Sequence, residues 1–92
     1  MDLSQASNEK IAEYKATWKE KAHTVLTPCN MDVQGKYWCR NNLARWLWSM
    51  ESFVDNQHHK FMFERISDAE HFAKCFDLFV QTQDKYRINK YV

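Results

Sequence analysis

Two segments in which aromatic and polar residues alternate constrain the fold of this chain more than any other feature. Trp46, Trp48 and Met50 recur at every second position, and Phe61 and Phe63 do the same after the polar residues 55–58. Successive side chains of a strand point to opposite faces, so a period of two indicates strands that bury one face. The turn residues between them predict an antiparallel hairpin. Phe61 and Phe63 are expected to face the core.

A helix is predicted after the hairpin. Ser67 and Glu70 have the spacing of a capping box, in which each side chain binds a free backbone N–H group of the first turn. Behind this box runs an apolar stripe at helical spacing, formed by Ala69, Phe72, Ala73, Phe76, Phe79 and Val80. The stripe predicts one buried helix face.

The remaining segments complete an α+β order. Residues 4–22 are predicted to form an amphipathic helix that begins at Ser4 or Ser7. A short strand over 23–27 ends at Pro28, and a helix over 31–42 begins after Asn30 and contains Gly35. Residues 86–92 alternate well enough for a last strand or form a loose tail. We therefore predict a single domain over 1–92, with the helix over 4–22 followed by a ferredoxin-like β-α-β-β-α-β core with an antiparallel sheet over 23–92.

The composition excludes several classes of protein. One glycine and one proline in 92 residues leave no glycine-rich phosphate loop or dinucleotide fingerprint. A net charge of +1 is too balanced for a DNA coat protein or a polybasic membrane binder. We expect no secretory signal, because no basic patch followed by an apolar run begins the chain. Three cysteines, an odd number, fit reduced thiols in the cytoplasm.

No motif indicates catalysis, a cofactor or a bound metal. Nothing marks a nucleophile on a strained turn, so we expect a protein that is not an enzyme. His71 and Cys75 are four positions apart, which suits zinc chelation from one helix face, but Cys75 borders the apolar stripe and is expected to act as a small hydrophobe. His58 and His59 are expected in a solvated turn rather than as a ligand pair.

Nucleic-acid binding is the alternative function. The spacing from Phe61 to Ala69 agrees with the RNA-recognition motif, whose strand aromatics stack on bases. Glu64 occupies the alternate face that is apolar in that module, so Phe61 and Phe63 are expected in the core instead. The cations that would contact phosphates are Lys36, Arg40, Arg45, Lys60, Arg87 and Lys90.

One stretch of the chain carries a resemblance. It comprises Tyr37-Trp38-Cys39-Arg40-Asn41-Asn42, Trp46-Leu47-Trp48, Phe61-Met62-Phe63 and Asp68-Ala69, with Phe72 and Phe76. Over residues 36–79 the chain resembles a diffuse group of short proteins of tailed bacteriophages, which have a Trp-Cys helix, an aromatic hairpin and an Asp-Ala-x-x-Phe helix. The resemblance implies a phage accessory protein and transfers no functional residue.

The leading interpretation is a small non-catalytic interaction protein. Six Phe, four Trp, four Tyr and four Met exceed what a core of this size needs, and such residues dominate protein–protein contacts. We expect the protein to bind a host or viral protein and to modulate or inhibit it, as in host takeover, or to form a homodimer. The residues expected to make the contact are Ile11, Tyr14, Trp18, Tyr37 and Arg40.

Overall fold

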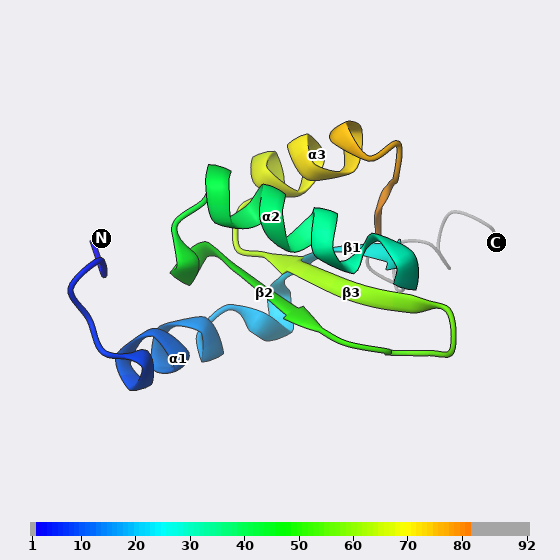
Figure 1. The fold of residues 1–92 in the computed structure, drawn as a ribbon. Helices are drawn as coiled ribbons and strands as arrows, with labels where there is room; N and C mark the ends of the chain where they lie inside the picture. The colour runs from blue at the N-terminus through cyan, green and yellow to red at the C-terminus, as the bar shows by residue number, and fades with distance from the viewer. Residues whose placement is uncertain (1, 82–92) are drawn as a thin grey trace, which may run out of the picture.

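The computed structural model describes residues 2–81, which form an α+β fold with helices on both sides of one sheet (Figure 1). The helices are α1 (Asn8–Ala16), α2 (Asp32–Asn42) and α3 (Ile66–Cys75), with short 3₁₀ turns η1 (Lys19–Lys21), η2 (Cys29–Met31) and η3 (Arg45–Leu47). The strands are β1 (His23–Pro28), β2 (Trp48–Glu51), β3 (His58–Phe63) and β4 (Val80–Gln81). The predicted α+β class is confirmed. The expected strand over 86–92 lies outside the described residues.

The four described strands form an antiparallel sheet in the order β2-β3-β1-β4. Phe61 pairs with Val25 of β1 and with Met50 of β2, so these three side chains share the face beneath α2 and α3. Phe61 and Phe63 are fully buried, which confirms the predicted hairpin faces. The predicted strand from Trp46 is too long, because Arg45–Leu47 form a 3₁₀ turn and β2 begins at Trp48.

Helix α3 begins and ends differently from the prediction. Its N-cap is Arg65 and no side chain caps it, so the predicted capping box of Ser67 and Glu70 is wrong; Arg65 Nε instead donates to Asp68 Oδ2 at 2.8 Å. The helix stops because Asp77 adopts a positive φ of 57°. The N–H of Leu78 then donates to the carbonyl of Ala73 at 2.7 Å, as in a Schellman motif. Phe79 therefore leaves the helical stripe and is 82% exposed.

Helix α2 crosses the sheet at close range. It begins at Asp32, and its N-cap is Met31 rather than the expected Asn30. Gly35 faces the sheet, where a Cβ atom would lie only 2.6 Å from Cζ of Phe61. The glycine lowers helix propensity by about 1 kcal/mol relative to alanine. Because Gly35 has no side chain, the backbone of α2 can lie in contact with the buried ring of Phe61.

Helix α1 lies beside the end of the sheet and packs against η3, and the segment that follows it covers the face opposite α2 and α3 (Figure 1). It is shorter than the predicted 4–22, beginning after Ser7, whose hydroxyl accepts from the N–H of Lys10, and ending at Ala16. After it, Trp18 and Ala22 pack against Met62, which points away from the Phe61 face. Tyr14 donates its hydroxyl to both carboxylate oxygens of Glu64 at 2.8 Å. The apolar side of the N-terminal segment therefore packs against the sheet of its own chain.

Candidate functional site

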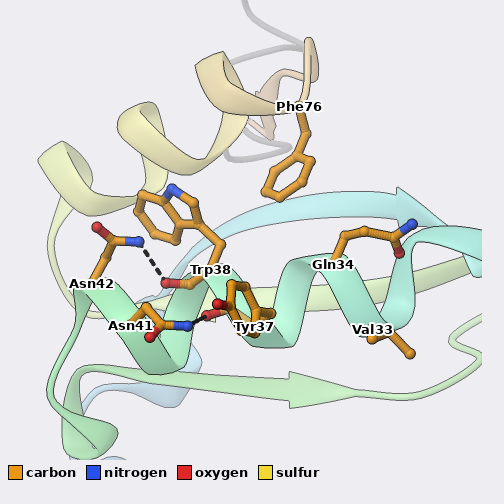
Figure 2. A pocket seen from close by; sticks show the side chains of 7 residues that line it. All are labelled: Val33, Gln34, Tyr37, Trp38, Asn41, Asn42 and Phe76. Carbon is orange, nitrogen blue, oxygen red and sulfur yellow. Dashed lines mark hydrogen bonds between the residues drawn. The ribbon is translucent and has the colours of Figure 1, made fainter.

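A shallow apolar groove runs between α2 and α3 on the outer side of the helix layer (Figure 2). Its volume is about 360 Å³. Most of the lining comes from one side of α2, and Phe76 closes the other side after the end of α3. The residues that line it are Val33, Gln34, Tyr37, Trp38, Asn41, Asn42 and Phe76.

The floor of the groove is continuous with the core. Trp38 meets Phe72 edge to face, with ring centroids 5.4 Å apart, and Phe76 lies 5.0 Å from the same ring. Aromatic contacts of this kind add to the stability that burial provides. The side chains of Trp38 and Phe76 are therefore held in place by packing, and the groove is a preformed surface.

The rim of the groove is apolar and exposed. Val33 and Tyr37 lie one turn apart on α2 and are 74% and 69% exposed. At the far end, the side-chain amides of Asn41 and Asn42 donate to the carbonyls of Tyr37 and Trp38 at 2.7 and 2.8 Å (Figure 2). These bonds hold the two amides against their own helix. The groove consequently offers apolar surface along its length and fixed polar groups at one end.

The structure separates the residues that were expected to bind a partner. Tyr37 lies on the rim, and Arg40 is exposed on the same helix. Ile11 and Trp18 are each only 5% exposed, and Tyr14 is half-buried and bound to Glu64. The apolar stripe of the N-terminal helix was expected to face a partner, and this expectation is corrected, because the stripe is covered by the chain's own sheet and the η3 segment.

Val33 and Phe76 were not recognised as surface residues from the sequence. Val33 and Tyr37 are an i, i+4 apolar pair on a helix whose buried face contains Gly35 and Cys39. A second apolar stripe, on the side of the helix away from the buried one, was the signal that could have revealed the rim. Phe76 belongs to the apolar stripe of α3. Its side chain is partly exposed because the groove separates it from α2.

The cations proposed for nucleic-acid binding do not share one surface. Lys36 forms an ion pair with Asp32 at 3.1 Å, and Lys60 lies opposite Glu51 in the sheet register. Arg40 is exposed on α2, whereas Arg45 lies beside α1 and donates to Asn8 and to the carbonyl of Ala6. Arg87 and Lys90 lie outside the described residues. Since Phe61 and Phe63 are fully buried, neither can stack on a base.

The candidate metal ligands and the cysteines stay apart. His71 and Cys75 are both exposed on α3, so the expectation that Cys75 acts as a small hydrophobe is wrong. Residues 2–81 contain no group of three or more side chains that could hold a metal ion. Cys29, Cys39 and Cys75 are free thiols. Burial raises the pKa of Cys39 to about 12, with a smaller contribution from Asp68. Cys39 therefore stays protonated and acts as a core residue.

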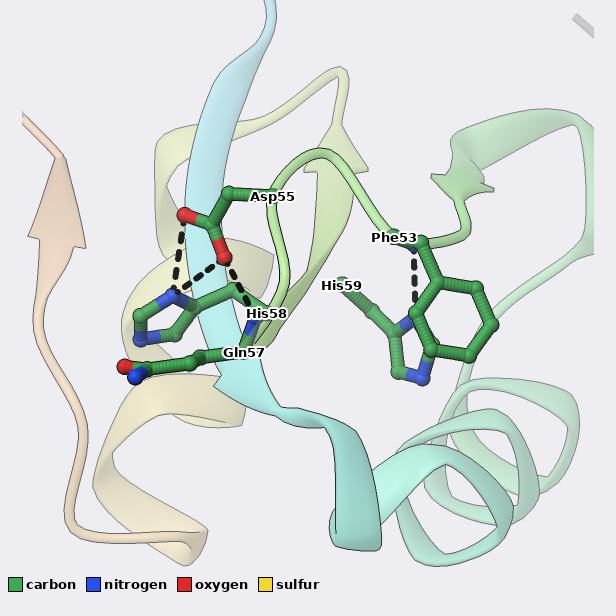
Figure 3. A network of polar contacts seen from close by, with 5 residues as sticks. All are labelled: Phe53, Asp55, Gln57, His58 and His59. Carbon is green, nitrogen blue, oxygen red and sulfur yellow. Dashed lines mark hydrogen bonds and ion pairs between the residues drawn. The ribbon is translucent and has the colours of Figure 1, made fainter.

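The two adjacent histidines have different environments (Figure 3). Nδ1 of His58 lies 3.0 Å from Oδ1 of Asp55 on the surface. The pKa of Asp55 is held below its usual value, mainly by the hydrogen bond from the backbone N–H of Gln57 and to a smaller extent by the hydrogen bond with the His58 ring. His59 is only 2% exposed, so its expected place in a solvated turn is wrong. Its Nδ1 accepts from the backbone N–H of Phe53 at 3.0 Å, and the two rings meet edge to face. This contact stabilises the positive φ of Phe53 in the hairpin loop.

None of the helices among residues 2–81 has the length and apolar character needed to cross a bilayer. No protein-family model, curated protein or solved structure gives a significant match to the chain. Within residues 2–81, the exposed groove between α2 and α3 is the candidate site that the geometry supports.

Proposed function

We propose that this is a small non-catalytic interaction protein that binds a protein partner in the groove between α2 and α3 and thereby modulates or inhibits that partner. One observation carries the proposal, namely the exposure of Val33 and Tyr37 beside an apolar groove. Contiguous exposed apolar surface on a small protein typically marks an interaction site. The rigid floor lowers the entropic cost of association, because Trp38 and Phe76 are already held by the core.

A protein partner suits the groove better than a small molecule. The groove lies open at the surface, and its rim residues stand outside it rather than closing over it. Binding sites for small molecules usually enclose most of the ligand. An apolar ridge, such as one face of an amphipathic helix, would bury Val33 and Tyr37 along the length of the groove.

Two further features of the proposal, a phage origin and a ferredoxin-like topology, are supported by the sequence resemblance and by the strand order. The similarity of residues 36–79 to short tailed-phage proteins supports a phage-encoded protein that acts on a host or viral protein in the cytoplasm. The strand order β2-β3-β1-β4 supports a ferredoxin-like assignment of the β-α-β-β-α-β unit. A homodimer through the same groove is the competing assembly.

Site-specific photo-crosslinking tests the groove. A photoreactive residue replaces Val33 in one tagged variant and, in a control, the exposed Glu20 of η1, which lies between the two residues that pack on Met62. After irradiation in a bacterial lysate with and without nuclease, the Val33 position is expected to crosslink one protein that the Glu20 position does not. The double variant Val33→Ser, Tyr37→Ser should lose this partner and keep its melting temperature, because both side chains are exposed.

Two results would contradict the groove assignment. Equal crosslinking from both positions would indicate nonspecific contact. Retention of the partner by the folded double variant would place the contact elsewhere on the chain. A crosslink to a second copy of the chain, together with a dimer in sedimentation analysis, would replace the foreign partner by a homodimer.

A further inference from the structure

The two ends of the α2–α3 groove differ in the hydrogen-bonding groups that they offer. Asn41 and Asn42 line one end, at the C-terminus of α2 (Figure 2). Each side-chain amide donates one N–H to a carbonyl of its own helix, which fixes the orientation of the amide. Within residues 2–81 both amides form hydrogen bonds through Nδ2 alone, so two oriented Oδ1 acceptors remain at this end.

These acceptors suit a helix better than an extended segment. An extended segment carries backbone N–H and C=O groups that need partners along its whole length. Between its ends the groove is lined by apolar groups, apart from the amide of Gln34 and the hydroxyl of Tyr37. A helix satisfies its own backbone except at its termini, and asparagine oxygens accept well from the free N–H groups of a first turn. The two acceptors therefore match the N-terminus of a helix that lies in the groove.

Arg40 favours the same direction. It lies three positions after Tyr37 and seven after Val33, on the side of α2 that carries the exposed rim, and it directly precedes Asn41 and Asn42. Arg40 is exposed and takes part in none of the ion pairs within residues 2–81. Acidic residues are favoured in the first turn of a helix, so a helix that begins at this end brings carboxylates to Arg40.

The neighbouring charges of the two helices do not cancel that of Arg40. Asp32 pairs with Lys36 at 3.1 Å, toward the N-terminal end of α2. Glu70 and Lys74 are opposite charges one turn apart on α3 and so add no net charge. The positive charge of Arg40 is therefore left for a partner.

The other end of the groove has the opposite character. Helix α3 runs antiparallel to α2, so Phe76 lies toward the end of the groove that Val33 and Gln34 line (Figures 1 and 2). Asp77 follows Phe76 directly and is exposed. Basic residues are favoured in the last turn of a helix, which suits a bound helix that ends here.

We propose that the groove binds an amphipathic helix of the partner that runs antiparallel to α2, with its first-turn N–H groups at Asn41 and Asn42 and its first-turn carboxylates at Arg40. This inference rests on the proposed function and adds to it the kind of segment that is bound and its direction. From Val33 to Asn41 helix α2 rises about 12 Å, so a bound helix of two to three turns spans the groove. The antiparallel arrangement also brings opposite ends of the two helix dipoles together.

A displayed library of random peptides of about 15 residues, enough for about four turns of helix, tests the direction. Peptides are selected on the full chain and counter-selected on the Val33→Ser, Tyr37→Ser variant, so that groove-dependent binders remain. Their sequences should have apolar residues at helical spacing and Asp or Glu in the first turn. In a synthesised binder, a photoreactive group at the first position should crosslink to the C-terminal end of α2, and one at the last position to its N-terminal end.

A double-mutant cycle tests the contact with Arg40. Arg40→Gln should weaken binding of the selected peptide about threefold, which is typical of one exposed ion pair. It should not weaken binding of the same peptide after its first-turn carboxylates are changed to amides, because the ionic interaction is then already absent. Lys10→Gln removes an exposed cation from α1 and is the matched control, which should leave both affinities unchanged.

The outcomes separate this inference from the proposed function. Crosslinks in the reverse order, or acidic residues selected in the last turn, would overturn the direction. Apolar residues that alternate along the selected peptides would replace the helix by an extended segment, and equal losses for both peptides on Arg40→Gln would remove Arg40 from the site. Selected sequences that copy a segment of this chain would point to a second copy as the occupant. Failure to select any peptide that depends on Val33 and Tyr37 would instead contradict the proposed function itself.

Discussion

A single tyrosine couples the N-terminal helix to the sheet. Tyr14 donates to both oxygens of Glu64 at 2.8 Å, across fifty positions of sequence. The carboxylate accepts this bond best when it is ionised and the phenol is neutral. The hydrogen bond to Glu64 therefore raises the pKa of Tyr14 above its ordinary value of 10.0, with burial and the charge of Glu64 acting in the same direction.

The direction of this shift predicts a pH dependence. The folded state holds the phenolic proton more tightly than the unfolded state does, so the stabilisation is complete below the ordinary pKa of 10.0 and is lost as pH rises through the raised value. Tyr14→Phe should lower the free energy of unfolding by about 1 kcal/mol at pH 7. Urea titrations of both proteins from neutral to alkaline pH measure the difference. If the difference in the free energy of unfolding between the two proteins stays constant above pH 10, this role is contradicted, because the other tyrosines are present in both proteins.

At the scale of elements, the approach of α2 to the sheet depends on one missing side chain. Gly35→Ala would place a methyl group 2.6 Å from Cζ of Phe61, a ring that is fully buried and packed against Phe72 and Trp48. Overpacking typically costs about 1–3 kcal/mol, whereas alanine returns about 1 kcal/mol of helix propensity. We expect a net loss of up to about 2 kcal/mol in the free energy of unfolding.

The matched control for this prediction is Gln34→Ala, one position away on the exposed side of the same helix. It should change stability by less than about 0.5 kcal/mol. Chemical denaturation of the two variants measures both values. Stabilisation by Gly35→Ala would mean that Phe61 moves aside without cost and that the contact does not fix the position of α2.

A comparison of several elements shows how far the sequence could predict the fold and the site. Alternation at Phe61 and Phe63 predicted the hairpin and its buried face, because a period of two depends only on local geometry. The end of α3 at Asp77, the burial of His59 and the 3₁₀ turn before β2 depend on contacts with other elements, which periodicity does not record. The groove was missed for the same reason. Val33 and Tyr37 are visible as an apolar pair, but the space beside them exists only once α3 and Phe76 are in place.

At the scale of the whole molecule, α2 and α3 cover one face of the sheet, and Tyr14 of α1 with the segment after that helix covers the other. The second face is covered by a small cluster in which Trp18 and Ala22 pack on Met62. This cluster explains why the apolar stripe of the N-terminal helix is not available to a partner. It also gives Met62 a buried position between two strand residues that face the main core.

Trp18→Ala should open this second face. Trp18 is 95% buried, since its relative exposure is 5%, and its loss should lower the free energy of unfolding by about 3 kcal/mol. The variant should also bind a hydrophobic dye, because Met62 becomes accessible. Glu20→Ala, two positions along and exposed, is the control and should leave both measurements unchanged. A Trp18→Ala protein with wild-type stability and no dye binding would show that the α1 layer is not docked in solution.

The bond between Tyr14 and Glu64 also orders events in time. During synthesis α1 leaves the ribosome before β3, yet the acceptor of Tyr14 lies fifty positions later in the sequence, just beyond the end of β3. Closing so long a loop is slow and becomes favourable only after the strands have paired. The N-terminal helix therefore cannot pack until β3 has formed, and Trp18 stays exposed until then. Pulse-labelled hydrogen exchange during refolding should protect the amides of β1 and β3 before those of α1, so a helix that is synthesised before the sheet becomes stable only after it.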